Sequence, residues 1–399
     1  MGSRNVLLAG ALLTIISWIL LALAKSVTTL IIGRIVAGIG DGVSLPCISI
    51  YICEIASKDI RGRLGAIPPL IAVFGNVFVL GAGPFLEYRT LIVSCAVFPV
   101  TFTILFWFMP NSPYFLMKNN KRKDAELNLM RLLGARDPAE VQNELREINE
   151  AIEHETGSLT LVQIMCSPNF RKSLLIAFGK VHYITLQEIY RIILVAQNIS
   201  SFCGMHVIVS YLQIILASSG ISMSKELTSV VFGLVQIPAV ILYGVFMDKF
   251  GRKPTFFASA LGASIALISE GVYIYLAETV DLTNVTFVPV LCIISYQFFI
   301  SLGMVCLPHF IVGELFTIET KKVASSILML YSSIIIFTNV KVIGGKVDSW
   351  SLHIIFWVYG GVCLLGVFFA LFMLPETKGK SFTEIQSGIS SHNRSSPRM

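Results

Sequence analysis

Long apolar stretches dominate the hydropathy pattern of this chain, and shorter polar segments separate them. A run of about 20 apolar residues is long enough to cross the hydrocarbon core of a bilayer as a helix. Ten such stretches can be recognised, at residues 6–24, 29–52, 64–85, 91–109, 193–217, 230–247, 255–276, 287–312, 324–343 and 353–374. The pattern therefore predicts an all-α integral membrane protein with about ten spans.

Composition supports this prediction and excludes several other classes. Hydrophobic residues make up 55% of the chain and charged residues 14%, with a mean hydropathy of +0.77, whereas about a quarter of the residues in soluble domains are charged. The net charge of +6 is explained by cation-rich loops, so we expect no nucleic-acid partner. The eight cysteines show no paired ligand spacing, and we expect no metal or cofactor. No nucleophile–base pair or His-x-x-x-His spacing is present, which argues against an enzyme.

The connecting segments alternate in charge, and this alternation predicts the orientation. The segments that carry most of the cations lie at 58–63, 118–172, 249–253, 321–322 and from 378 onward. Because cation-rich loops face the cytoplasm, both termini are expected inside. The triplet that begins at Asn284 is a glycosylation signal, and it falls on an expected outer loop.

The spacing of the spans predicts four regions. Residues 1–110 form a first bundle with four spans, and residues 111–172 form a cytoplasmic linker in which acids and bases alternate at helical spacing. Residues 173–377 form a second bundle with six spans. Residues 378–399 are expected to be a cytoplasmic tail.

A carboxylate followed by cations closes corresponding spans in the two halves. Glu54 precedes the cations of segment 61–63, and Glu314 precedes the pair 321–322. Internal duplication is typical of transporters that move one bundle against the other. Such carboxylates can form ion pairs that break when an inner gate opens, or they can simply anchor helix ends at the interface.

An ordered set of short motifs resembles the sugar porter family of the major facilitator superfamily. The matching motifs are GR at 33–34, Glu54 with RG at 61–62, PNSP at 110–113, DKFGRK at 248–253, GE at 313–314 and PETKGK at 375–380. Two further segments, LGAIP at 64–68 and LEYR at 86–89, look most like the insect facilitated trehalose transporters. The resemblance implies a multi-pass carrier of a hexose or a trehalose-like disaccharide in the plasma membrane.

The resemblance also implies a substrate site, and this chain departs from the family there. The family's Gln-Gln-x-Ser-Gly-x-Asn run matches SSFCGMH at 200–206, so serines replace both glutamines and His206 replaces the asparagine. A family tryptophan is replaced by His309. Because a hydroxyl is shorter than an amide and bonds less extensively, we expect weaker sugar binding or altered specificity. The expected substrate contacts are Ser200, Ser201, His206, Tyr211, His309 and Asn339.

Other residues are expected to act in gating, and alternative roles are considered for the histidines of the substrate site. The expected gating residues are Arg34, Glu54, Arg61, Asp248, Arg252, Glu314 and Lys321. The two site histidines could instead relay protons, which would make the protein a proton-coupled symporter. Lys341 lies in an apolar stretch and is expected to face a cavity or a partner. A non-transporting paralogue that senses sugar or assembles with others is a further alternative.

Two features suggest an altered gene product. Segment 2–5 is a clipped copy of the loop motif at 248–253, and in the family this copy follows the second span. We therefore expect the first two of twelve spans to be missing. Residues 180–197 add a charged segment before the substrate run, and this is expected to reflect truncation or mis-splicing.

Overall fold

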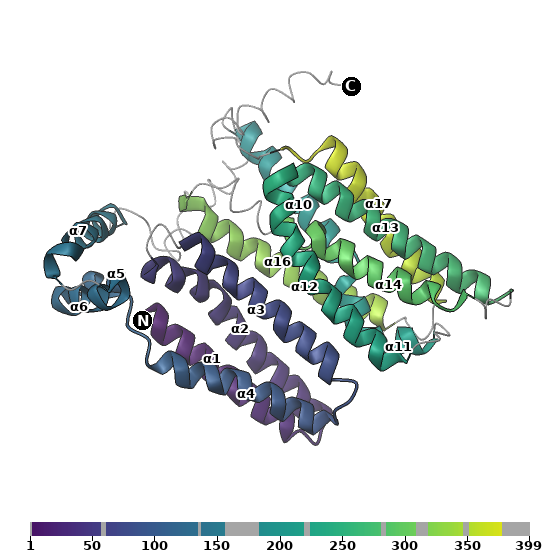
Figure 1. Ribbon diagram of the computed structural model, residues 1–399, viewed down its shortest axis with the longest axis horizontal. Coiled ribbons are helices and arrows are strands. Elements are labelled where there is room, and N and C mark those ends of the chain that lie inside the picture. Colours follow the sequence, from purple (N-terminus) through teal and green to yellow (C-terminus); the bar gives the residue numbers. More distant parts are fainter. Residues whose placement is uncertain are drawn as a thin grey trace. The chain divides into compact units, whose positions relative to one another are not determined.

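The computed structural model describes residues 2–56, 61–134, 137–155, 183–218, 224–280, 285–308, 318–345 and 351–376. The chain divides into two compact units, residues 1–159 and 160–399, and each is described separately. Within the described ranges every regular element is a helix (Figure 1). The all-α prediction is confirmed.

Four long helices form the body of the first unit: α1 (Ser3–Ala22), α2 (Val27–Ile55), α3 (Arg61–Ala82) and α4 (Tyr88–Trp107). Helix α1 packs against both α2 and α4. Leu7, Leu8, Tyr51 and Phe106 are buried together at this contact, with 5.1 Å between the ring centroids of the tyrosine and the phenylalanine. Helical hydrogen bonding satisfies the backbone of each apolar run, as a bilayer requires.

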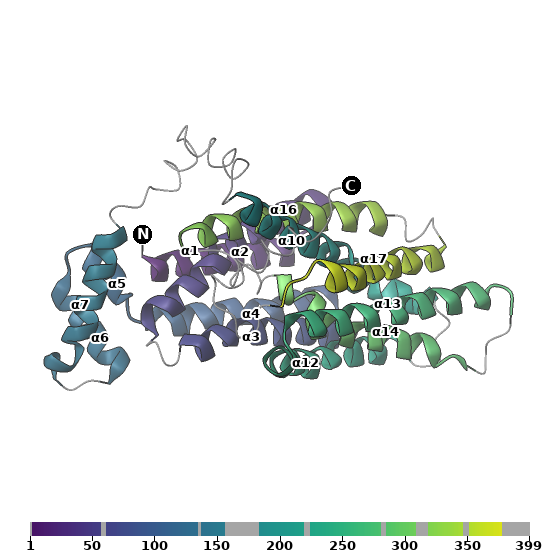
Figure 2. The same ribbon diagram turned by 90° about the horizontal axis from the view of Figure 1, so that it is seen from above.

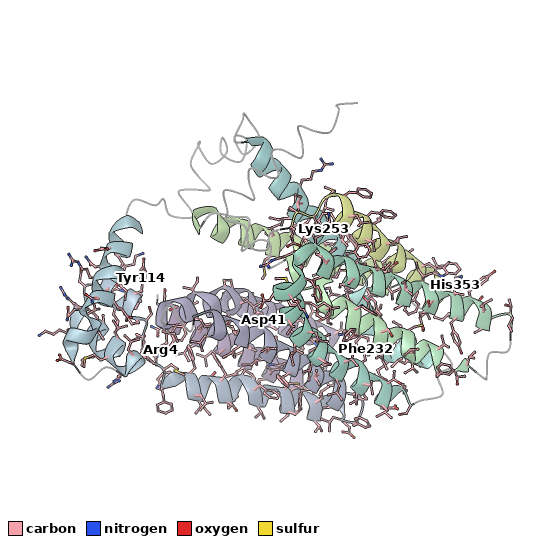
Figure 3. The ribbon with its side chains drawn as sticks, turned by 45° about the horizontal axis from the view of Figure 1, so that its top comes forward. Arg4, Asp41, Tyr114, Phe232, Lys253 and His353 are labelled. Atoms are coloured by element: carbon pink, nitrogen blue, oxygen red, sulfur yellow. The ribbon has the colours of Figure 1, made fainter. Side chains whose placement is uncertain are left out.

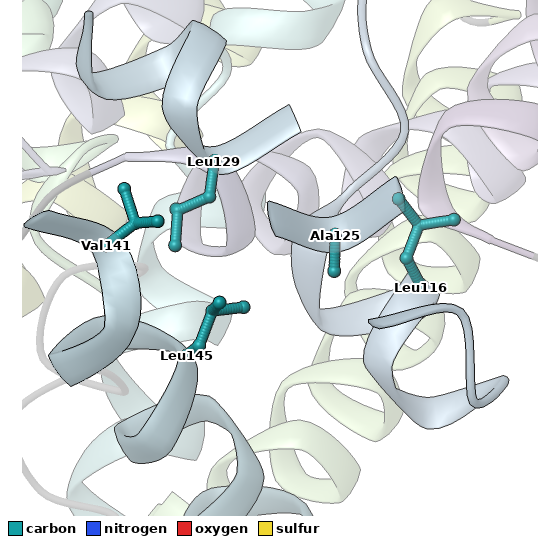
Figure 4. Packing of buried hydrophobic residues seen from close by; sticks show 5 residues of the cluster. All are labelled: Leu116, Ala125, Leu129, Val141 and Leu145. Atoms are coloured by element: carbon teal, nitrogen blue, oxygen red, sulfur yellow. The ribbon is translucent and has the colours of Figure 1, made fainter. Parts of the chain in front are cut away.

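Three shorter helices follow in the predicted linker: α5 (Pro113–Lys118), α6 (Arg122–Leu133) and α7 (Pro138–Glu155). Their apolar side chains form a small core of their own, shown in Figure 4, made by Leu116, Ala125, Leu129, Val141 and Leu145. Charged residues alternate over the remaining faces. The described residues of this segment therefore form a packed helical cluster.

The second unit contains the remaining described helices. They are α10 (Tyr183–Phe202), α11 (Met205–Ser218), α12 (Lys225–Phe250), α13 (Arg252–Ala277), α14 (Val288–Phe299), the short η2 (Ile300–Met304), α16 (Ile318–Gly344) and α17 (Leu352–Phe372). Helices α13 and α17 lie side by side in both ribbon views (Figures 1 and 2). Helix α10 contacts α16 and α17, and α14 packs between α12 and α13.

Small residues allow α13 and α17 to approach closely. Ser264 on α13 donates its hydroxyl hydrogen to the Gly360 carbonyl on α17 at 2.9 Å, and both residues lack bulk at the contact. Gly366 of α17 lies against Ala260 of α13. In a membrane, where lipid competes with apolar side chains, small residues and cross-helix hydrogen bonds are the usual basis of helix packing.

Within the described residues, each of the ten predicted apolar stretches lies mainly on helices. Seven helices in the described ranges are long and apolar enough to cross a membrane, and three shorter apolar helices, Leu70–Ala82, Val288–Met304 and Leu328–Gly344, coincide with the other three stretches. The described part of segment 180–197, from Tyr183 onward, is a continuous part of α10. Ile193 and Ala196 are fully buried there, so this part of the segment packs into the second unit.

Candidate substrate site and inner gate

A break between α10 and α11 interrupts the run that the sequence associates with substrate. Helix α10 ends at Phe202 and α11 begins at Met205. Gly204 between them has a φ of +96°, and a Cβ atom there would lie 2.7 Å from the ring of Tyr359. Glycine tolerates this backbone conformation without strain. The helix is therefore interrupted within the run, 200–206, that the family resemblance associates with substrate.

Side chains from two other helices bind the carbonyl groups at this break, and a third helix supports one of them. Asn339 of α16 donates its amide to the Ser201 carbonyl at 3.1 Å, and Tyr296 of α14 donates its hydroxyl to the Cys203 carbonyl at 3.1 Å. Tyr359 of α17 donates to the amide oxygen of Asn339, also at 3.1 Å. We call these five residues the helix-break network. All are buried, so each bond satisfies a group that water cannot reach.

The structure separates the predicted substrate contacts into two groups. Ser200, Ser201 and Asn339 are buried, and both ends of the Asn339 amide are already occupied by protein partners. His206, in the first turn of α11, is exposed, and Tyr211 is half-buried against Gly344. The network therefore holds the break together, whereas the His206 side chain makes no part of it and is exposed. His309 lies outside the described residues.

Two buried glutamines were missed by the sequence interpretation. Gln197 lies one turn before Ser201 on α10, and its amide is 3.5 Å from the hydroxyl of that serine. Gln297 on α14 is fully buried, and neither atom of its amide has a hydrogen-bond partner among the described residues. Polar residues within apolar stretches are the signal that would have identified both.

The loop motif at 248–253 is tied to the end of α17. The carboxylate of Glu376 accepts hydrogen bonds from the backbone N–H groups of Arg252 and Lys253, at 3.0 and 3.1 Å. The ammonium group of Lys253 donates to the Leu371 carbonyl at 2.8 Å, and Figure 3 places Lys253 beside this end of α17. A carboxylate at a helix N-terminus satisfies free N–H groups and complements the helix dipole. Glu376 therefore anchors the start of α13.

The predicted gating residues are only partly described. Arg252 takes part in the anchored turn, and Asp248 is exposed. Glu54 accepts a hydrogen bond from the Ser3 hydroxyl at 2.6 Å, which ties the end of α2 to the start of α1. The side chains of Arg61 and Lys321, and the whole of Glu314 and Asn284, lie outside the described residues.

Two of the predicted gating residues, Arg34 and Glu54, lie far apart along one helix. Both residues lie on α2, with Arg34 in its second turn and Glu54 in its last. At 1.5 Å per residue, twenty residues of helix separate them by about 30 Å, the thickness of a hydrocarbon core. Arg34 is exposed near the opposite end of the helix. Lys341 lies in the last turn of α16 and is also exposed.

Glu270 on α13 is a buried carboxyl group that the sequence interpretation overlooked. Its side chain is 1% exposed, and neither oxygen has a hydrogen-bond partner among the described residues. A lone acid inside an apolar stretch was the available signal.

We expect Glu270→Met to raise the midpoint of thermal unfolding in detergent, because it replaces two unpartnered oxygens with an apolar group of similar length. The free energy of unfolding should increase by about 1–3 kcal/mol, which is the usual penalty of an unsatisfied buried polar group. Glu278→Gln is the control, since Glu278 is half-exposed at the end of the same helix, 3.3 Å from His353. A lower midpoint for the methionine variant would mean that the carboxyl stabilises the fold.

Comparison with known proteins agrees with this architecture. The family described as "Sugar (and other) transporter" matches residues 1–388. The chain is 26% identical over 390 residues to the facilitated trehalose transporter Tret1 of Drosophila mojavensis, covering 97% of this chain and 43% of that protein. It is also 26% identical to Tret1 of Apis mellifera ligustica, covering 96% of this chain and 74% of that protein. The chain thus spans less than half the length of some curated relatives.

Among solved structures, the inward-open conformation of the xylose transporter XylE from E. coli has a TM-score of 0.75 and 21% identity, with 96% of this chain and 82% of that chain covered. This likeness shows the fold, which is that of the major facilitator superfamily. Families of this kind are transporters and not enzymes. The match over nearly all of its length shows that the chain belongs to the sugar transporter family.

Proposed function

We propose that the protein carries a neutral sugar, a hexose or a trehalose-like disaccharide, across the membrane by facilitated diffusion with alternating access. The observation that carries this proposal is the broken helix α10–α11, surrounded by amide and hydroxyl groups without formal charge. A neutral polyol needs many hydrogen bonds and no counter-ion. Relatives named as trehalose transporters support this substrate class.

Within the site, we assign direct sugar contact to His206, Ser200 and Tyr211, with His309 as a further contact. His206 follows the break and is exposed, so its imidazole can donate to or accept from a sugar hydroxyl. Asn339 and Ser201 act by holding the break in place. Gln297 is the one buried amide in α14 whose hydrogen-bonding groups are unused among the described residues.

For the inner gate, we propose that the anchored turn at Arg252 changes its contacts when the carrier opens to the cytoplasm. Asp248, Glu314 and Lys321 belong to the same proposal, since the sequence places them in cytoplasmic connections. We also assign the protein to the plasma membrane with both termini in the cytoplasm. The distribution of lysine and arginine over the loops supports this orientation.

Proton-coupled sugar transport is a second candidate, because of Glu270. Ionisable groups inside membrane spans commonly form the proton pathways of transporters. The Glu270 carboxyl lies in such a span without an ionic partner among the described residues. The two candidates differ in whether collapse of the proton gradient stops uptake.

Uptake of radiolabelled trehalose and glucose into proteoliposomes tests the proposal. We expect saturable uptake that a protonophore does not reduce. His206→Ala should raise KM by about tenfold, the effect of losing one hydrogen bond of about 1.4 kcal/mol, with little change in thermal stability because the side chain is exposed. His206→Asn, which restores the amide of the family run, should keep KM near or below that of the wild type.

Ser333→Ala is the matched control, because among the described residues this exposed hydroxyl on α16 bonds within its own helix, to the Met329 carbonyl at 2.9 Å. Loss of uptake with the protonophore would favour the symporter. Binding of sugar without flux would favour a sensor. If neither uptake nor binding occurs in a chain that is folded by its melting curve, the proposal fails.

A further inference from the structure

The continuation of α14 contains a wide turn. Helix α14 ends at Phe299, and residues Ile300–Met304 form a single π-helical stretch. The Val305 N–H donates to the Ile300 carbonyl at 3.3 Å, across five residues where an α-helix would span four. Such turns are rare, are usually single insertions within an α-helix, and occur often at functional sites.

A hydroxyl from another helix is inserted into this turn. The Ser259 hydroxyl on α13 donates to the Phe299 carbonyl at 2.6 Å and accepts from the Met304 N–H at 2.9 Å. The two backbone groups that it joins are five residues apart, which is the spacing of a π-helical hydrogen bond. Ser259 is completely buried, so water cannot take its place. One serine therefore bridges the two sides of the wide turn.

The surrounding residues are small enough for the serine to reach. A Cβ atom at Gly303 would lie 3.2 Å from the Thr255 carbonyl oxygen and 3.3 Å from the Ser259 Cβ, so the absence of a side chain permits the approach. Gly262, less than one turn after Ser259, lies against the ring of Phe299. The backbone of η2 is therefore pressed against α13 over this length.

We propose that Ser259 is a positioning residue: its hydroxyl holds the wide turn open and so sets the rotation of the segment that follows, Val305 to Pro308. An α-helix advances by about 100° per residue, so closing a turn that contains one extra residue would rotate everything after it by about that angle. This segment leads from α14 towards the expected site residue His309. Its importance for sugar binding rests on the proposed function, but the positioning itself does not.

The test compares Ser259→Ala with Ser264→Ala in the purified full chain, without any transport assay. Both substitutions remove a buried hydroxyl of α13 that bonds a carbonyl of a neighbouring helix. In Ser259→Ala, hydrogen exchange at the amides between Ile300 and Val305 should rise by about tenfold or more, because Met304 loses its acceptor. The rate of Cys306 alkylation by N-ethylmaleimide, measured by mass spectrometry, should change by about threefold or more, because the thiol rotates.

Ser264→Ala should leave the exchange and alkylation rates near those of the wild type. It should lower thermal stability by an amount similar to that for Ser259→Ala. The proposal is overturned if Ser259→Ala leaves exchange and alkylation unchanged, or if Ser264→Ala produces the same changes. Should the alanine variant fail to fold, Ser259→Cys retains a weak donor and acceptor of similar size. It should then give exchange faster than the wild type, and unchanged exchange would contradict the proposal.

Discussion

Gly251→Ala is expected to lower the free energy of unfolding by about 2–4 kcal/mol, from backbone strain together with the loss of a helix cap. Gly251 has φ +95° and ψ −179°, a conformation that is nearly exclusive to glycine. A Cβ atom there would also lie 2.5–2.7 Å from the carboxyl atoms of Glu376. The carboxylate would have to leave the N–H groups of Arg252 and Lys253. Thermal unfolding in detergent measures the effect.

Gly244→Ala is the matched control, since Gly244 lies within α12 and a Cβ atom there meets nothing within 4 Å. This variant should be unchanged or more stable by about 0.5–1 kcal/mol, because alanine is the better helix former. Glu376→Gln should cost about 1 kcal/mol, since it keeps the shape of the cap and removes its charge. Equal stability of the two glycine variants would show that Glu376 does not anchor α13.

Asn339→Leu is expected to cost about 1–3 kcal/mol, because it leaves two buried groups without partners. These groups are the Ser201 carbonyl and the Tyr359 hydroxyl, each 3.1 Å from the Asn339 amide. Hydrogen bonds between helices in membranes often contribute less free energy than about 1–3 kcal/mol, because other groups can replace a lost partner. The measured cost therefore shows whether other groups can replace Asn339 in the helix-break network. The midpoint of thermal unfolding is again the measurement.

Two tyrosine variants separate burial from hydrogen bonding at this site. Tyr359→Phe removes one bond to Asn339, and Tyr331→Phe removes a similar bond of 3.0 Å to the amide oxygen of Asn198. The second pair is only partly buried, so we expect Tyr359→Phe to be clearly the more destabilising. If both variants lose the same stability, burial does not strengthen the hydrogen bonds of the helix-break network.

Corresponding helix ends in the two halves of the sequence repeat make different contacts. Asn111 in the motif at 110–113 stands where the motif at 375–380 has Glu376. The Asn111 carbonyl accepts a bond from the Asn128 side-chain amide at 3.1 Å, and α1 begins after Gly2, which has no side chain to cap it. Only the second half therefore has a carboxylate cap at this position in the described residues. A repeat in sequence does not guarantee a repeat in contacts.

The helix break illustrates which parts of the candidate site could be predicted from the sequence. The match of residues 200–206 to the family run marked the segment in which the structure places the break, at Gly204 with a φ of +96°. Asn339 was also expected to contact the substrate, although both ends of its amide bind protein groups. An amide suited to bind a sugar is chemically identical to one that binds a carbonyl, so residue type alone could not distinguish the two roles.

The sequence by itself determined the membrane class, the positions of the spans and the family, because twenty-residue apolar runs and charged loop motifs are local properties of the chain. Only the tertiary structure decided that Glu270 is buried, that Glu376 caps α13 and that Ser259 enters the turn of η2. These contacts join residues far apart in sequence or depend on which face of a helix packs inward. In spans that are apolar on every side, hydropathy does not encode that face, and packing between helices selects it.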